Sequence, residues 1–208
     1  MIDCGADWLR RVRDIGPNAI VLTHAHPDHA AGLAEGAPCP VYATEATLDL
    51  IHRYPITDKH RMPSRNPLRI GALTFEAFPV CHSLRAPAVG YRVSAGGICV
   101  FYVPDVAELP NAKNALRGIA VYIGDGATMT RSMVRKQSGT LIGHAPIAVQ
   151  LGWCERAGVH RAIFTHCGSA IVRGQPQRLS VTLRQLGCER DVAASLACDG
   201  DRLSFGGG

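Results

Sequence analysis

The chain has 208 residues, with 22 Lys and Arg against 17 Asp and Glu, which gives a formal net charge of +5. Because 47% of the residues are hydrophobic and only 19% are charged, global disorder is excluded, and the length is that of one domain, residues 1–208. The longest strongly apolar run, Ile98–Val103, is far below the about 20 residues of a spanning helix, which excludes a membrane protein. The mildly positive charge is compatible with a small anionic substrate.

Short β-branched runs alternate with amphipathic stretches along the chain, which predicts an α/β layered fold. The predicted strands are, in chain order, Ala19–Thr23, Val41–Ala43, Leu73–Phe78, Val89–Ser94, Ile98–Val103, Ile119–Ile123, Ala162–Thr165 and Val192–Ala197. The predicted helices are Ala6–Arg13, Asp28–Glu35, Glu45–Arg53, Pro146–Ala157 and Gln177–Leu186. The segment Arg53–Pro67, rich in Pro, Arg and His, is predicted to be a loop.

The first residues, Met1–Gly5, have the pattern of a strand end that runs into a glycine turn, with nothing before it to pair. We therefore expect that the natural chain starts upstream, or that the fold lacks its first strands. An incomplete sheet would expose an edge that favours pairing, so a homodimer is compatible with the sequence.

The eight cysteines are scattered, and none of them forms a C-x-x-C pair. No basic segment followed by an apolar stretch marks a secretory signal. In a chain of this length such spacing predicts reduced, buried thiols and a cytoplasmic protein rather than a disulfide framework.

A dense group of histidines, His24-Ala25-His26-Pro27-Asp28-His29, directly follows the predicted strand Ala19–Thr23. Residues two apart on an extended backbone project to the same side, so His24 and His26 can bind one metal ion. Asp28 and His29 open the following helix in a different direction, which suits a second metal ion nearby. Imidazole and carboxylate ligands favour zinc, with manganese and iron as alternatives.

Three further ligand-type residues have the same placement at strand ends. His82, Asp105 and His166 each follow a predicted strand, and strand ends bring side chains to the edge of a sheet, where sites are built. We therefore expect these three side chains to complete the metal site.

This constellation resembles the ligand motifs of the metallo-β-lactamase superfamily, and the resemblance covers nearly the whole chain. It implies an αββα four-layer sandwich with a dinuclear metal site along one edge. The resemblance also assigns the ligands: His24, His26 and His82 to the first metal, Asp28, His29 and His166 to the second, and Asp105 as the bridge between them.

Finer matches favour phosphodiester chemistry among the reactions of this superfamily. A true β-lactamase usually has Cys where Asp105 stands, which disfavours antibiotic hydrolysis. Cys81-His82-Ser83 and Gly143-His144 resemble segments of ribonuclease Z, and Cys198-Asp199-Gly200 resembles the terminal turn of phosphoribosyl cyclic phosphodiesterases. Ribonuclease Z carries a long Gly/Pro-rich arm that holds tRNA, and no such insertion occurs here. A small or nucleotide-like phosphodiester is therefore favoured as the substrate, and a nucleic acid remains an alternative.

The predicted mechanism uses a metal-bridging hydroxide, because two metal ions can lower the pKa of a shared water toward 7. Asp28 would accept or orient its proton, and His144 would either stabilise the equatorial oxygens or protonate the leaving oxygen. Arg131, Arg135 and Lys136 are candidates for binding a substrate phosphate. The alternatives are a thioester or lactone hydrolase of the same fold and an inactive, truncated domain.

Overall fold

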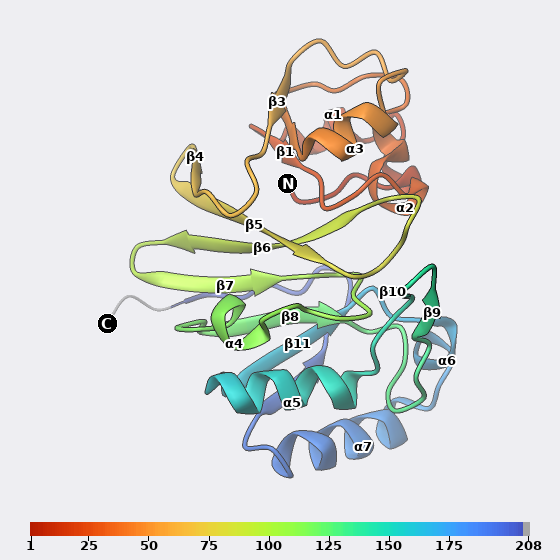
Figure 1. Ribbon diagram of the computed structural model, residues 1–208, viewed down its shortest axis with the longest axis vertical. Helices are drawn as coiled ribbons and strands as arrows, with labels where there is room; N and C mark the ends of the chain where they lie inside the picture. The colour runs from red at the N-terminus through yellow and green to blue at the C-terminus, as the bar shows by residue number, and fades with distance from the viewer. Residues whose placement is uncertain (206–208) are drawn as a thin grey trace.

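The computed structural model describes residues 1–205 of the chain. Within these residues the strands form two sheets and a separate hairpin (Figure 1). The first sheet is parallel, in the order β1 (Ile20–Val21), β2 (Val41–Ala43) and β3 (Lys59–Arg61). The second has seven strands, in the order β12 (Ala193–Leu196), β11 (Arg161–Thr165), β8 (Val121–Asp125), β7 (Ile98–Tyr102), β6 (Ala88–Ala95), β5 (Leu73–Val80) and β4 (Leu68–Ile70). The hairpin pairs β9 (Arg135–Gln137) with β10 (Thr140–Ile142).

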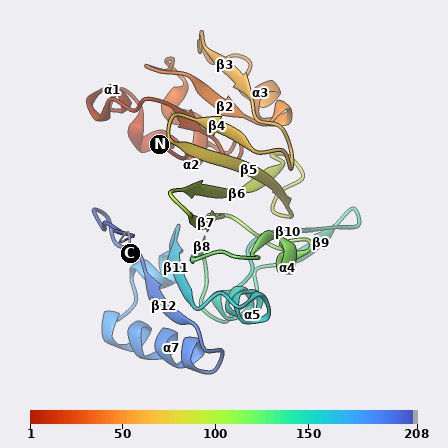
Figure 2. The ribbon, with the colours of Figure 1, turned by 90° about the vertical axis from the view of Figure 1, so that its left-hand side faces the viewer.

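Helices cover both outer faces, so the layers run helix, sheet, sheet, helix (Figure 1; Figure 2). The first sheet is covered by α1 (Val12–Ile15) and α3 (Glu45–Leu50), and the second by α5 (Ile147–Ala157) and α7 (Pro176–Cys188). The shorter helices are η1 (Ala6–Trp8), α2 (Pro27–Ala30), η2 (Ala31–Leu33), α4 (Ala112–Ala115) and α6 (Ser169–Val172). The expected αββα sandwich is confirmed.

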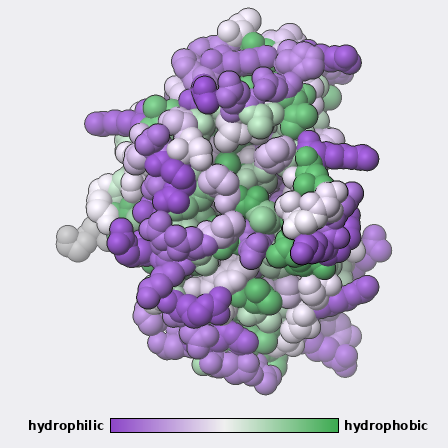
Figure 3. All heavy atoms as spheres, viewed as in Figure 1, coloured by the Kyte–Doolittle hydropathy of each residue, from purple (hydrophilic) through white to green (hydrophobic). Residues whose placement is uncertain are grey.

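The apolar cores explain why these strands are nearly continuous hydrophobic runs. Successive residues of β1 face opposite sides: Val21 enters the core between the two sheets, whereas Ile20 packs under the helices of the first layer. Phe101 and Tyr122, on neighbouring strands, are fully buried together with Leu151 of α5. Many large apolar side chains therefore lie in these interior layers, and the face in Figure 3 shows many hydrophilic residues with hydrophobic ones scattered among them.

The strand directions bring several loops to one edge of the second sheet. β5 and β7 both pair antiparallel with β6, and β7, β8 and β11 pair parallel with one another. The carboxyl ends of these four strands therefore lie at the same edge, and the segments that follow them meet there.

Two predicted helices are shorter and more irregular than expected. The predicted helix Ala6–Arg13 is a 3₁₀ turn, η1, followed by α1, because Arg10 takes a left-handed conformation with φ of +65°. The predicted helix Asp28–Glu35 changes from α2 to the 3₁₀ helix η2 at Ala31. Gly32 packs there against the Cys4 backbone and thiol, a contact that would exclude any larger side chain.

The loop predicted at Arg53–Pro67 is wrong in part, because it contains β3. This edge strand carries Lys59, His60 and Arg61, so it shows no apolar pattern and is held by backbone hydrogen bonds to the segment of β2. The β9–β10 hairpin was also missed, although its turn has the residues Ser138-Gly139, both with positive φ.

The cysteines are all free, as expected for reduced thiols, and all eight lie within residues 1–205. The expectation that they are buried is wrong for several of them. Cys4 and Cys154 are buried, but Cys188 and Cys198 are exposed. Within the same residues, no helix has the length and hydropathy to cross a membrane.

Candidate metal centre

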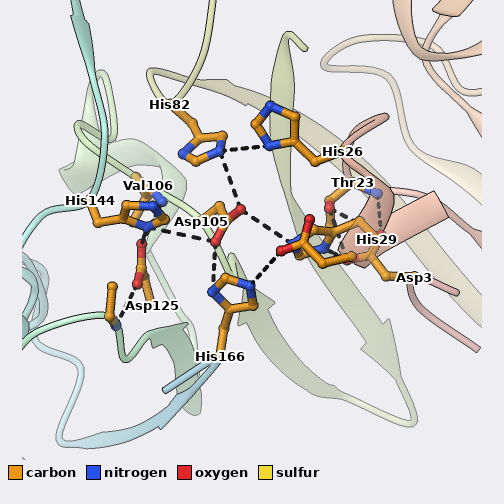
Figure 4. A network of polar contacts seen from close by, with 12 residues as sticks. Asp3, Thr23, His26, His29, His82, Asp105, Val106, Asp125, His144 and His166 are labelled. Atoms are coloured by element: carbon orange, nitrogen blue, oxygen red, sulfur yellow. Dashed lines mark hydrogen bonds and ion pairs between the residues drawn. The ribbon is translucent and has the colours of Figure 1, made fainter. Parts of the chain in front are cut away.

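All seven side chains predicted as ligands meet at one edge of the sandwich (Figure 4). His24 follows β1, and His82, Asp105 and His166 follow β5, β7 and β11. His166 comes directly after its strand in a left-handed conformation with φ of +52°, which is rare for a side chain of this size. Such strained residues gather at functional sites.

Four of these residues form one group, in which His24, His82 and Asp105 are buried and His26 is half-buried; we call it the buried group. The His26 Nδ1 atom lies 3.0 Å from Nε2 of His24 and 3.3 Å from Nε2 of His82. The Asp105 Oδ2 atom lies 3.3 Å from the same Nε2 atoms of His24 and His82. One ligand atom from each residue therefore faces a common point, with all pairs within 4.8 Å.

Three residues form an open group beside it: Asp28, His29 and His166. The Asp28 Oδ2 atom lies 3.2 Å from Nε2 of His166 and 3.6 Å from Nε2 of His29. The Asp28 side chain is 59% exposed and that of His166 is 32% exposed, whereas His29 is buried. This group therefore faces solvent.

Asp105 contacts both groups. Its Oδ2 atom lies 3.3 Å from Nε2 of His29, and its Oδ1 atom lies 2.9 Å from Nδ1 of His166. Burial alone would raise the pKa of Asp105, but the contacts with His166, His24 and His29 hold it well below its usual range. Asp105 is therefore a carboxylate, and it occupies the position expected of a shared ligand.

Unpaired buried atoms indicate that this cluster is built for cations. Within residues 1–205, three of the four buried side-chain atoms that make no aligned hydrogen bond lie in this cluster: His29 Nε2, Asp105 Oδ1 and His166 Nδ1. Burying such atoms without a partner is costly. Imidazole nitrogens and carboxylate oxygens that converge on common points match the donor set of divalent transition metals. The residues present therefore fit divalent metal ions.

Asp3 holds ligands of both groups, and the sequence did not single it out. It is buried, and its carboxylate accepts hydrogen bonds from the Thr23 hydroxyl at 2.9 Å and lies 2.9 Å from Nδ1 of His29. The same Thr23 hydroxyl lies 3.0 Å from Nδ1 of His24. These contacts leave Nε2 of both imidazoles facing the cluster. The only signal for this role was an acidic residue in the strand-like segment before Gly5.

A buried aspartate also fixes His144, which lies in the connection between β10 and α5 rather than at a helix start. Asp125, at the end of β8, lies 2.8 Å from Nδ1 of His144 and accepts hydrogen bonds from the backbone of Val106 and Ala127. The hydrogen bond to Asp125 raises the pKa of His144 against the effect of burial. The missed signal for Asp125 was a strand end at the same edge as Asp105. Asp125 and His144 also form a fourfold cluster with Asp105 and His166, within ligand distance of one another.

The predicted substrate residues separate into two sets. Arg131 lines a cavity of about 510 Å³ together with His144, His166 and Ser169. Arg135 and Lys136 lie on β9 with exposed side chains and do not line this cavity. The geometry thus brings only Arg131 of the three cations to the ligand cluster.

Residues 1–167 match the beta-lactamase superfamily domain. The chain belongs to this superfamily. The match covers both ligand groups, and it confirms the family that the sequence motifs indicated. The chain is therefore an enzyme of the metallo-β-lactamase-fold hydrolases, whose fold implies divalent metal ions.

Known relatives of this superfamily member share its fold over most of its length. Ribonuclease Z of Mycobacterium bovis (strain BCG / Pasteur 1173P2) is 21% identical over 227 residues, covering 86% of this chain and 79% of that protein. A diphosphatase of the PhnP family has a TM-score of 0.68 at 24% identity, covering 98% of this chain and 78% of that one. The metallo-β-lactamase fold protein YhfI from Bacillus subtilis has a TM-score of 0.68 at 16% identity, covering 94% and 81%. At these identities the structural likeness shows the fold alone.

Proposed function

We propose that this protein is a phosphodiesterase that holds two divalent cations and acts on a small or nucleotide-like phosphodiester. The first cation would be held by His24, His26 and His82, the second by Asp28, His29 and His166, with Asp105 shared between them. Zinc suits this donor set, and manganese or iron are compatible with it. When bound, such a pair of cations activates water and neutralises the charge of the phosphoryl oxygens.

The observation that carries this proposal is the Asp125–His144 pair beside Arg131. Asp125 binds Nδ1 of His144, which leaves Nε2 of that ring for a substrate, and His144 and Arg131 line the same cavity. A phosphodiester needs positive charge near its oxygens and a proton for its leaving oxygen. This cavity supplies a guanidinium for the first need and an imidazole with a raised pKa for the second.

The chain's own residues then divide the proton transfers between them. Asp28, with its exposed carboxylate, accepts a proton from the attacking water, whose oxygen forms the new bond to phosphorus. The bond to the leaving oxygen breaks, and His144 donates its Nε2 proton to that oxygen. Asp125 stabilises the imidazolium before this step and keeps the ring oriented.

The segment between the two histidine motifs supports a small substrate. In the described structure, the residues from His29 to His82 form η2, β2, α3, β3, β4 and β5 and their connections. Most of their buried apolar side chains belong to the core that contains Ile20 or to the core between the two sheets, which contains Val21. Within residues 1–205, nothing in that stretch extends as an arm. A substrate is therefore held by the cavities at the cluster itself.

The test is a comparison of three ester classes on one preparation. Purified protein loaded with Zn²⁺ or Mn²⁺ is assayed on bis-p-nitrophenyl phosphate, on an acyl thioester and on a lactone. We expect hydrolysis of the phosphodiester to be the fastest and to be lost on chelation. Hydrolysis of the thioester or lactone alone would replace this proposal with the corresponding acyl hydrolase, and no hydrolysis of any of them would favour an inactive domain.

A further inference from the structure

A second cavity opens at the cluster and has a different chemical character. It has a volume of about 620 Å³ and is lined by Trp8, Pro27, Asp28, Tyr102 and His166, among others; we call it the Trp8 cavity. The cavity that contains His144 and Arg131 is called the His144 cavity. Among the described residues, His166 alone lines both cavities. Figure 4 shows His144 and Asp3, which line different cavities, on opposite sides of Asp105.

The charges of the two cavities differ. Among the described residues that line the Trp8 cavity there is no lysine or arginine, and Asp7 adds an exposed carboxylate. Arg11 lies nearby, with its guanidinium 5.5 Å from the Trp8 ring centroid, but it does not line the cavity. The His144 cavity, in contrast, contains Arg131 and no carboxylate among its lining residues within 1–205. An anionic group is therefore favoured on one side and disfavoured on the other.

Trp8 is fixed relative to the ligands, although it lies on a short 3₁₀ turn. Gly5, directly before η1, packs so closely against Asp28 that a Cβ there would collide with the Asp28 carbonyl. The backbone N–H of Cys4 also donates to the carbonyl of His29 at 2.7 Å. The segment that carries Trp8 is therefore joined to the helix that carries two ligands of the open group.

We propose that the Trp8 cavity is the subsite for the uncharged organic substituent that the phosphodiester keeps after hydrolysis, stacked on the Trp8 indole. This inference rests on the proposed phosphodiesterase function. A phosphorus atom beside His166 has one substituent in each cavity, and the leaving oxygen needs the proton of His144. The retained substituent then lies on the Trp8 side, where a planar, uncharged group such as a nucleobase fits. A substituent with a further phosphate is disfavoured by Asp7 and by the lack of a lysine or arginine among the described lining residues.

Two p-nitrophenyl diesters with the same leaving group test the subsite: methyl p-nitrophenyl phosphate and thymidine 5′-(p-nitrophenyl phosphate). In Trp8→Ala we expect the preference for the thymidine ester, measured as the ratio of the two kcat/KM values, to fall about tenfold, mainly through KM. Trp8→Phe, which keeps an aromatic face, should restore most of that preference. Val181→Ala, at an exposed apolar position on α7, is the matched control and should leave kcat/KM unchanged for both esters.

A charge reversal gives an independent readout. A 3′-phosphate on the thymidine probe should raise its KM for the wild-type protein, and Asp7→Lys should lower that KM again. Binding is also measured without any variant that affects folding: thymidine 5′-monophosphate should quench the tryptophan fluorescence of the wild-type protein in a saturable manner. Trp153, the second tryptophan, is a buried residue of α5 and should contribute little to this change.

The outcomes separate this inference from the proposed function. If the wild-type protein hydrolyses neither diester, the phosphodiesterase proposal fails. If it hydrolyses both, but Trp8→Ala slows them equally or the wild-type fluorescence does not respond to thymidine 5′-monophosphate, the function stands and the subsite at Trp8 is wrong.

Discussion

The two ligand groups share Asp105 but differ in how the fold surrounds them. In the buried group, the side chains of His24, His82 and Asp105 are at most 5% exposed, whereas Asp28 of the open group is 59% exposed. His166 of the open group also lines both cavities. The fold therefore encloses most of one group and leaves Asp28 and His166 of the other partly open to solvent. We therefore expect substitutions in or beside the two groups to affect cation binding, catalysis and substrate binding separately.

The largest effect is expected where the two groups meet. Asp105→Ala should remove both cations and reduce hydrolysis by more than the roughly 10²–10⁴-fold expected of a single acid–base group. The reason is that this carboxylate contacts candidate ligands of both groups. Metal analysis and the diester assay measure the two losses together. Asp14→Ala, on exposed α1, is the control, and an Asp105 variant that keeps two cations and most of its activity would contradict the shared role.

The next effect separates catalysis from cation binding. His144→Ala should lower kcat by about 10²–10⁴-fold while both cations stay bound, because the ring donates a proton rather than holding metal. The loss of kcat should be greater when methoxide is the leaving group than when p-nitrophenolate is, because p-nitrophenolate is a weaker base and needs less protonation. His52→Ala, an exposed histidine after α3, should change neither property. Loss of a cation from His144→Ala would instead favour the fourfold cluster of His144, Asp125, Asp105 and His166 as a metal site.

The sequence predicted the centre better than the surroundings that position it. The convergence of the candidate ligands could be predicted because strand ends carry His and Asp residues, and a strand end fixes where a side chain emerges. Asp3 and Asp125 were missed because single aspartates within two residues of a glycine are typical of turns. Their role depends on which loops meet in space, and one-dimensional spacing does not show that.

The fold shows the same division between what packs and what does not. Largely buried strands such as β2 and β11 were predicted to within one residue, because hydrophobic burial sets both their pattern and their position. β3 and β9 carry mostly exposed, charged side chains and pair with their neighbouring strands through backbone hydrogen bonds, so hydropathy gave no indication of them. Arg135 and Lys136 are close to Arg131 in the sequence, but their exposed side chains on β9 do not line the cavity that contains Arg131.

A smaller effect compares the two aspartates that lie behind the groups. Asp3→Asn should weaken cation binding by about 10–100-fold, because Asp3 orients His29 directly and His24 through Thr23. Asp125→Asn should leave cation affinity unchanged and lower kcat, because Asp125 orients only His144 among these rings. Titration with a chelator of known affinity measures the first property, and the diester assay measures the second. Equal loss of cation affinity in both variants would show that the two sides of the cluster are not independent.

The smallest effect concerns the cations at the rim of the open group. Arg131→Ala should raise KM for a phosphodiester roughly tenfold, which is the loss of one hydrogen bond to a charged group. Arg135→Ala and Lys136→Ala should change KM less than about twofold at physiological salt, because their exposed side chains lie outside the cavity and act through screened charge. The distinction is sharpest in a salt series. The KM increase of Arg131→Ala should persist as salt is added, since it reflects a direct contact, whereas any effect of the two β9 cations should disappear. If all three substitutions show the same salt-sensitive increase, the guanidinium of Arg131 contributes only to the general field of the hairpin, and the cavity beside His144 loses its anion-binding role.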